Sequence, residues 1–405
     1  MQKPSKLYVK LGDRIVILTE VKRGTVSLKQ AGELLEISYR HAKRLYKIFK
    51  TTGVMGLLPK KRTKPPWNKT TAEVKRKIIT IKEQFPAVNC CHLADLLKEQ
   101  GITVSHETIR TILIKNRLHT PGPKPKRRPR KRFEAEKAGK LVQMDTSPYH
   151  WIPAIAKELK LILTFDDHSR KPLAARIAEH DTTWENMCVL PPRVGSFDRK
   201  TIEKYGIFET LYTDCDAKFK YYRTNFSLYF NYQKAPEEVD TQISQALAEL
   251  GIIILNTHPH APHEKGKIER FFGFLQARLP IEFQIHDITT VEAANRYLEK
   301  YLDKHSSQWV HYTTGIIPDE RFKNSCFKPL PSDKDLDKIF SLREIRKVKK
   351  DNTFSYQGQT FQLTNFKYRA YWGNTEIVLR IIPEKEISVY HQDRFVQKFR
   401  CNGTK

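Results

Sequence analysis

The chain has 405 residues, 39% of them hydrophobic, so it is long enough for several domains of about 100–150 residues. Its 72 lysines and arginines exceed its 45 acidic residues and give a net charge of +27, which points to a polyanionic partner such as nucleic acid. A ribosomal or membrane-surface protein is the alternative. No run approaches the roughly 18–20 apolar residues of a membrane span, and the N-terminus lacks the apolar region of a secretory signal.

The six cysteines are scattered and form no C-x-x-C pair, which favours reduced thiols and a cytoplasmic location. Cys90, Cys91 and His92 could suggest a metal site. Adjacent cysteines do not comfortably share one tetrahedral zinc ion, however. We interpret these residues as packing at the start of a helix.

Residues 1–58 are predicted to form a helix-turn-helix domain. Ser27 is a suitable N-cap for a helix over residues 28–35, which should bury Leu34 among other apolar residues, and a second helix runs from Tyr39 to Lys50. The outer face of the second helix carries basic side chains that suit phosphates and base edges, as a recognition helix requires: Arg40, Lys43, Arg44 and Lys47. An ordinary solvated helix is the alternative.

Residues 68–120 repeat this plan as a second helical DNA-binding domain. Helices are expected over residues 71–85 and 89–100, and Ser105 should cap a third. Arg110 and Lys115 would lie near or on the exposed face of that third helix. The basic, proline-rich run at 121–132 cannot bury apolar surface, so residues 121–137 are predicted to be a linker that lies along phosphates; a nuclear localisation signal is the less favoured alternative.

Residues 138–325 alternate between strands and helices, which indicates an α/β domain. Its predicted strands cover residues 141–145, 159–165, 173–178, 211–214 and 252–255, and its clearest helices cover 240–250 and 265–278. Short β-prone runs return in residues 340–402 at 353–356, 360–363, 375–381 and 387–390. These runs suggest a small β-barrel.

Three acidic residues carry the chemical prediction. Asp145 and Asp214 each follow an apolar strand, where ligands and metals tend to lie in open α/β sheets. Glu269 adjoins the apolar stripe of a helix that should pack on the sheet. Carboxylate oxygens suit Mg²⁺, and two such ions can activate the attacking oxygen and stabilise the leaving oxygen at phosphorus. Taken singly, each acid fits a surface or capping role better than that of a ligand, but the three together, in this order and on these elements, favour a metal site.

Four segments resemble the DDE superfamily of insertion-sequence transposases and retroviral integrases: LVQMDTS at 141–147, LTFDDHSR at 163–170, LYTDCD at 211–216 and PHAPHEKGKIER at 259–270. The resemblance implies an RNase H-like catalytic core and covers nearly the whole chain. It places Asp145, Asp214 and Glu269 at the catalytic, metal-binding positions, with two Mg²⁺ ions as cofactors and Mn²⁺ as a substitute. It also implies a prokaryotic-type protein associated with the nucleoid.

The sequence departs from the family pattern at three points, one of which is the Pro191-Pro192 pair that interrupts the helix expected after Trp184. Cys215 stands where the family has asparagine, and Asp214 and Glu269 lie 55 positions apart, farther than the minimal pattern, with the extra length expected at residues 221–238. Rival acids also lie near each position: Asp166 and Asp167 for the first acid, Asp216 for the second and Glu264 for the third. Lys265 and Lys267 are expected to contact DNA beside the site.

The function expected from these features is DNA transposition: residues 13–120 recognise the element ends, and the core cuts the DNA and joins it to a target. A homo-oligomer on DNA is expected because two ends must be handled together. The sequence does not reveal whether a helper ATPase takes part. The alternatives are a catalytically silent, domesticated DNA-binding regulator and an RNase H-like nuclease, although the nuclease does not explain two helix-turn-helix units.

Overall fold

The computed structural model describes residues 6–58, 69–120, 122, 133–190, 201–219, 221–223, 237–257, 265–365, 367, 369–383 and 385–400. Except for Gly122, the basic run at 121–132 lies outside the described residues, as do the rival acid Glu264 and the Pro191-Pro192 pair. The chain divides into two compact units, Met1–Lys75 and Arg76–Lys405. No helix in the described ranges has the length and apolarity needed to span a membrane.

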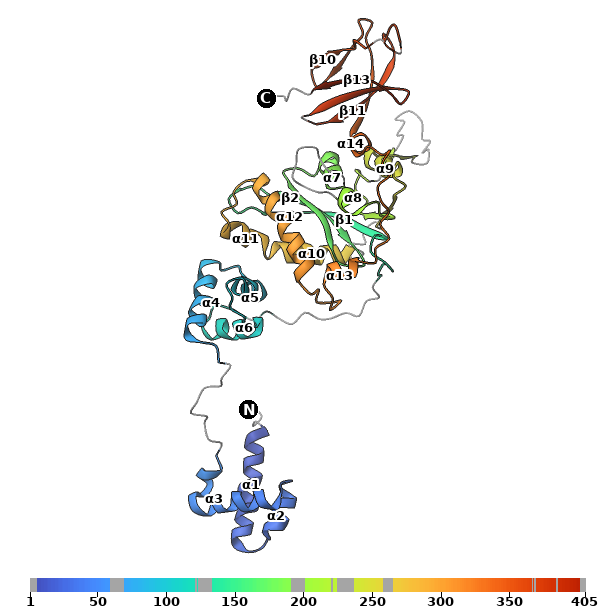
Figure 1. The fold of residues 1–405 in the computed structure, drawn as a ribbon. Helices are drawn as coiled ribbons and strands as arrows, with labels where there is room; N and C mark the ends of the chain where they lie inside the picture. Colours follow the sequence, from blue (N-terminus) through green and yellow to red (C-terminus); the bar gives the residue numbers. More distant parts are fainter. Residues whose placement is uncertain are drawn as a thin grey trace, which may run out of the picture. The chain divides into compact units, whose positions relative to one another are not determined.

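The first unit contains the predicted helix-turn-helix. Figure 1 shows its helices as a small bundle: α1 (Lys6–Arg23), α2 (Leu28–Leu34) and α3 (Tyr39–Leu57). The side chain of Ser27 caps α2 in a capping box with Gln30, and Ser38 caps α3. The bundle buries Leu18, Ala31 and Ala42. The predicted burial of Leu34 is wrong, because its side chain is 62% exposed.

The second set of helices follows the predicted plan closely: α4 (Ala72–Gln84), α5 (Cys90–Glu99) and α6 (His106–Lys115). Asn89 caps α5 and Ser105 caps α6, each by accepting a hydrogen bond from the third amide of its helix. Leu93 and Leu97 of α5 and Ile109 of α6 form the buried contact between these helices.

A five-stranded sheet forms the centre of the second unit. Its strands are β1 (Leu141–Tyr149), β2 (Leu159–Asp166), β3 (Pro172–Ala178), β4 (Thr210–Thr213) and β7 (Ile253–Asn256). The spatial order is β3-β2-β1-β4-β7. Strand β2 is antiparallel to both neighbours, whereas β4 and β7 are parallel to β1. All five strands were predicted. Strand β1 is longer than expected because it pairs with β2 as far as Tyr149, so Asp145 lies inside it rather than at its end.

Helices cover both faces of this sheet. Side chains alternate along β2, so its apolar residues belong to two cores: Ile162 packs on one face of the sheet, and Leu161 and Leu163 pack on the other. The helices of the first face are α7 (Thr183–Val189), α8 (Thr201–Tyr205) and α9 (Gln242–Ala248). Those of the second face are α10 (Gly266–Gln276), α11 (Leu279–Ile285) and α12 (Val291–Gln308). Farther along the chain lies the short helix α13 (Pro318–Phe322). In the predicted insertion, β5 (Tyr221–Arg223) pairs with β6 (Glu237–Val239).

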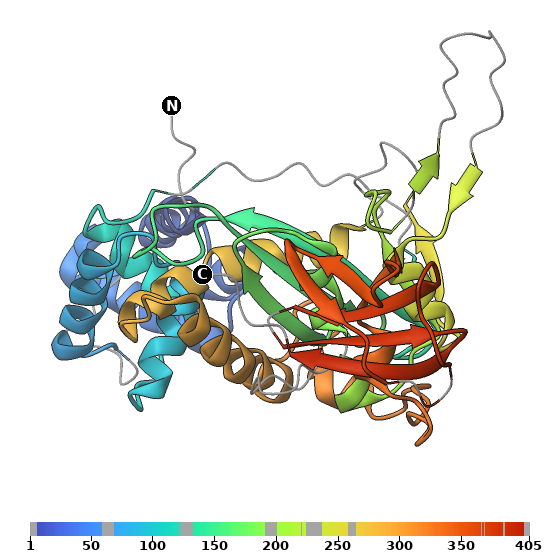
Figure 2. The ribbon, with the colours of Figure 1, turned by 90° about the horizontal axis from the view of Figure 1, so that it is seen from above.

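The C-terminal part is made of strands, which Figure 2 shows in red as a sheet of their own. After α14 (Leu336–Ile339) come β8 (Leu342–Lys347), β9 (Thr353–Tyr356), β10 (Gln359–Gln362), β11 (Glu376–Ile382), β12 (Glu386–His391) and β13 (Arg394–Arg400). The predicted barrel is not confirmed. The described strands form an open sheet, β13-β12-β11-β8, and a separate β9–β10 hairpin, so β13 and β8 remain edges.

Candidate active site

The pairing of β1 with β4 brings two of the predicted acids to one place. The two strands are parallel, and Gln143 lies opposite Tyr212. Two residues farther along each chain are Asp145 and Asp214, and residues two apart on a strand face the same side. Asp145 is 18% exposed, whereas Asp214, the first residue after β4, is 50% exposed. The pair therefore lies where the interior of the sheet meets solvent.

Lys265 places a positive charge between these acids. Its Nζ lies 2.7 Å from Oδ1 of Asp145 and 4.0 Å from Oδ2 of Asp214, and its side chain is only 7% exposed. Burial raises the pKa of Asp145, and the charge of Asp214 raises it further, although the Lys265 ammonium opposes both effects. Two carboxylates that converge on one cation provide oxygen donors of the kind that hard divalent ions prefer.

The third acid, Glu269, lies in the first turn of α10 with its side chain exposed. Residues four apart on a helix share one side, so Glu269 follows Lys265 by one turn on the same side. The predicted apolar stripe of this helix, including Ile268 and Leu275, is buried. Within the described ranges, no three His, Cys, Asp or Glu side chains lie close enough to hold one metal ion. The structure thus brings Asp145 and Asp214 together. That Glu269 shares a metal site with them stays a prediction.

The loop that carries Asp214 is fastened to the neighbouring strand. Asn256, the last residue of β7, donates its side-chain amide to the carbonyl oxygen of Asp214 across 2.8 Å and to the hydroxyl of Thr213 across 3.0 Å. Cys215 donates its thiol to the carbonyl oxygen of Thr257 at 3.0 Å. The cysteine that replaces the family's asparagine therefore takes part in holding the loop.

The rival acids have other partners. Asp216 accepts a hydrogen bond from the amide of Lys218 and lies 3.3 Å from its ammonium. Asp166 is fully buried and accepts hydrogen bonds from the amide of Gly139 and from both the amide and the hydroxyl of Ser169. Burial raises the pKa of Asp166, against the effect of these bonds. Asp166 is therefore closed to a substrate, whereas the side chain of Asp216, at 42% exposed, is nearly as open as that of Asp214.

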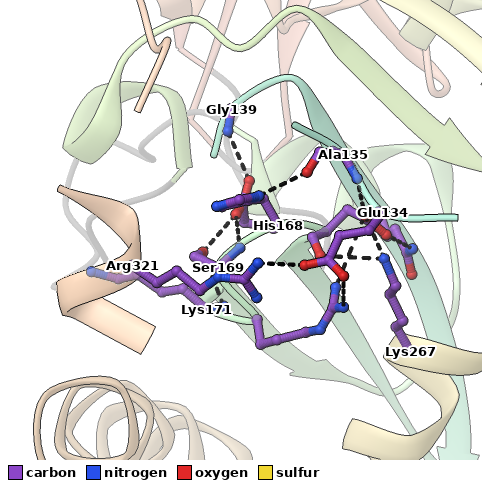
Figure 3. Close-up of polar contacts among 12 residues, drawn as sticks. Glu134, Ala135, Gly139, His168, Ser169, Lys171, Lys267 and Arg321 are labelled. Carbon is purple, nitrogen blue, oxygen red and sulfur yellow. Dashed lines mark hydrogen bonds and ion pairs between the residues drawn. The ribbon is translucent and has the colours of Figure 1, made fainter. Parts of the chain in front are cut away.

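Asp167 is the centre of a second buried network, part of which Figure 3 shows. Its Oδ1 accepts a hydrogen bond of 2.8 Å from the side-chain amide of Gln143, and its Oδ2 accepts bonds from the amide of Ala135 (2.8 Å) and from Nζ of Lys267 (2.5 Å). Burial lowers the pKa of Lys267, although Asp167 opposes this effect. The ammonium of Lys267, which was predicted to meet DNA, is therefore directed at a protein carboxylate here.

Comparison with known proteins adds to this geometry. Residues 13–66 match the family described as a helix-turn-helix domain, and residues 41–113 match the family described as a homeodomain-like domain. The transposase for insertion sequence IS1202 of Streptococcus pneumoniae is 26% identical over 363 residues, which cover 80% of this chain and 72% of that protein. An inferred transposase of Sinorhizobium fredii, y4bF, is 24% identical over 353 residues, with coverages of 86% and 72%.

Both relatives are insertion-sequence or inferred transposases, and the similarity to each extends over at least 80% of this chain. Among solved structures, a simian T-cell lymphotropic virus intasome is similar over 76% of this chain and 92% of that chain, with 14% identity and a TM-score of 0.35.

The predicted recognition helix is α3. Its basic side chains are exposed along one side, as a DNA-contacting face requires: Arg40, Lys43, Arg44 and Lys47. In the second helical domain, Lys115 is exposed at the end of α6, and Arg110 pairs with Glu107 at 2.9 Å. Contact of these residues with DNA stays a prediction.

A buried contact that the sequence did not reveal joins the second helical domain to the sheet domain. His92 of α5 is buried, and its Nε2 lies 2.6 Å from Oε1 of Glu282 in α11, whose other oxygen accepts from the hydroxyl of Tyr297. Burial favours the neutral form of Glu282, but the bonds from His92 and Tyr297 keep its pKa below the usual value. Nearby, Arg278 pairs with Asp95 at 2.7 Å. No local pattern could show a partner 190 residues away.

Proposed function

We propose that the protein is a DDE transposase that cuts DNA at the ends of its element and joins the ends to target DNA with the help of divalent metal ions. The observation that supports this most is the convergence of Asp145 and Asp214 on the ammonium of Lys265. The Lys265 ammonium is a positive charge between the two aspartates, and the groups that face it are carboxylate oxygens. Mg²⁺ fits such a donor set, and Mn²⁺ could substitute for it.

The fold supports this assignment as far as the sheet is concerned. Four of its five strands run in one direction and β2 runs against them, with helices on both faces. We assign this domain, residues 138–325, to the RNase H-like cores. The remaining proposed domains are 1–58 and 68–120 for DNA ends, the linker 121–137, and the C-terminal strands within 340–402.

In the proposed site the carboxylates of Asp145, Asp214 and Glu269 would hold the divalent ions. Two bound ions supply an activated attacking oxygen and stabilise the leaving oxygen at phosphorus. The chain supplies the alignment: β1 and the Asn256-anchored loop hold two carboxylates, and α10 carries the third. The Lys265 ammonium, which here lies on the two aspartates, would pair with a phosphate oxygen of the bound DNA when those carboxylates hold ions.

The proposed reaction has two displacements at phosphorus. Water first attacks a phosphodiester at the element end, the bond from phosphorus to the 3′ oxygen breaks, and a 3′-hydroxyl is freed. That hydroxyl then attacks a target phosphodiester, whose own 3′ oxygen leaves as a hydroxyl. Neither step needs a covalent bond to the protein. Two ends must reach one target, so we propose a homo-oligomer assembled on DNA.

The test is a cleavage and joining assay on duplexes that carry the inverted repeats flanking the gene. We expect nicking and strand transfer with Mg²⁺ or Mn²⁺ and none with EDTA, while scrambled ends bind weakly and are not cut. Sequence-specific binding without metal-dependent cleavage would instead identify a DNA-binding regulator that has lost its chemistry.

A further inference from the structure

Asp167 binds the two elements that carry proposed catalytic acids, although it lies outside the site. Its carboxylate is 1% exposed and holds Gln143 through one oxygen and Lys267 through the other. The close-up shows Lys267 reaching from its helix into this network, which also contains Ala135 (Figure 3). A carboxylate so enclosed is unavailable to substrate, so its role must be exerted through its partners.

Each partner lies two residues before a proposed catalytic acid. Gln143 precedes Asp145 on β1 and faces the same side of the strand. Lys267 precedes Glu269 in the first turn of α10. The hydrogen bonds that Asp167 accepts from Gln143 and Lys267 therefore hold the start of α10 against β1. They thereby set the separation of Glu269 from Asp145.

The start of α10 needs such a fastening. The side chain of its N-cap residue, Lys265, makes no capping hydrogen bond to the first turn of the helix. Two lysines tie its beginning to the sheet: Lys265 to Asp145, and Lys267 to Asp167. The bond between Lys265 and Asp145 uses a carboxylate that the proposed function assigns to metal ions, so this bond must break when ions bind. The bond between Lys267 and Asp167 lies outside the ion site and can persist throughout the reaction.

We propose that Asp167 is a positioning residue that, through Lys267 and Gln143, holds α10 and β1 at the separation needed for Glu269 to act with Asp145. This inference rests on the proposed function only for the role of the two acids. The tie between Asp167 and α10 can be tested without any catalytic assay. Charged hydrogen bonds of this kind are strong and add geometric specificity, and a displacement of about 1 Å at a catalytic group can cost about a hundredfold in rate.

The experiment compares full-length wild type with Asp167→Asn, Lys267→Met and the double variant. Asparagine keeps the size of Asp167 but turns an amide or a neutral oxygen toward the ammonium, and methionine keeps the stem of Lys267 without its charge. The matched control is Lys157→Met, which breaks an exposed ion pair with Glu179. The readouts are hydrogen exchange at the amides of residues 269–273, thermal stability, DNA binding and metal-dependent cleavage.

We expect exchange at residues 269–273 to be about tenfold faster in each single variant, since one charged hydrogen bond is lost. Exchange in the centre of β2 should stay near wild type. Cleavage should fall about tenfold or more while the affinity for DNA is unchanged. The double variant should match Asp167→Asn, because the link to Lys267 is already broken in that variant. Lys157→Met should change none of these quantities.

Wild-type exchange at residues 269–273 in both single variants would overturn the proposal, whatever happens to cleavage. Equal acceleration throughout β2 and α10 would also overturn it, because that result describes a general loss of stability. If Asp167→Asn does not fold, Lys267→Met decides the question, since its side chain is less enclosed. If exchange is faster in the variants but the wild-type protein never cuts DNA, the tie is supported and the proposed function is rejected.

Discussion

Lys265 donates a hydrogen bond from Nζ to Oδ1 of Asp145 at 2.7 Å, and so joins the N-cap of α10 to the middle of β1. The two residues are 120 positions apart in the chain. The same ammonium lies 4.0 Å from Asp214, so it reduces the repulsion between two carboxylates held near each other. A divalent ion that binds here must therefore compete with a charge that the protein supplies.

The first prediction concerns this competition. Lys265→Met should lower the free energy of unfolding without metal by about 2 kcal/mol, because Asp145 loses its charged partner. Added Mg²⁺ should then stabilise the variant at lower concentrations than the wild type, since no ammonium has to be displaced. Thermal unfolding at a series of Mg²⁺ concentrations measures both effects. An unchanged midpoint concentration would show that Lys265 does not compete with the ion.

Removing single carboxylates should separate chemistry from DNA binding. Asp145→Asn and Glu269→Gln should each reduce metal-dependent cleavage and joining by at least about a hundredfold, because each loses an ion ligand. Their affinity for end DNA, measured by fluorescence anisotropy, should stay within about twofold of wild type. The control is Asp216→Asn, which changes the rival acid near Asp214 and should remain active. Wild-type activity in either of the first two variants would reject the assignment.

The exposed basic face of α3 should determine the dependence of binding on salt. Lys43→Ala should weaken binding to all sequences and reduce the slope of log affinity against log salt by about 1. Arg40→Ala, at the start of the helix, should weaken binding to end DNA more than binding to random DNA if it reaches base edges. The control is Lys22→Ala on α1. Equal slopes for Lys43→Ala and wild type would place the DNA on another face.

The stability should also depend on pH through His305. Burial, together with the charges of His311 and Arg278, lowers the pKa of His305 to about 4 from 6.5. Between these values the unfolded chain binds a proton that the folded chain does not. The free energy of unfolding should therefore fall as the pH falls from 6.5 to about 4, by up to about 3 kcal/mol.

His305→Phe should flatten this part of the pH profile. The ring lies among Phe271, Phe274 and Trp309, so phenylalanine fits the surroundings and removes the titrating group. Urea unfolding at several pH values gives the comparison, and His150→Phe, at an exposed position, should keep the wild-type profile. A profile as steep in His305→Phe as in the wild type would mean that other groups account for the acid sensitivity.

The elements of the fold were largely predictable because periodicity and capping are local. Ser27, Asn89 and Ser105 mark helix starts correctly, and the apolar runs mark all five strands of the central sheet. Strands β8 and β13 were missed, because edge strands with one half-buried face carry many charged residues. Barrel closure could not be predicted, since it depends on which distant strands pair.

The site was predictable in part. Strand positions suggested that Asp145 and Asp214 would meet, and the resemblance supplied Glu269. The partners of the lysines were not predictable: Lys265 and Lys267 were expected to face DNA, but their ammonium groups lie on Asp145 and Asp167. The sequence around a lysine does not show whether a carboxylate from another strand lies within its reach.

The parallel pairing of β1 and β4 has a consequence for comparing relatives of different length. The neighbour of Asp145 is set by strand alignment and not by the length of chain between the acids. Evolution can therefore add a segment such as the β5–β6 ribbon, and widen the interval before Glu269, without separating the two aspartates. A single residue inserted inside β4 would rotate Asp214 to the opposite face of the sheet. Homologues are thus best aligned strand by strand, with gaps confined to the connections.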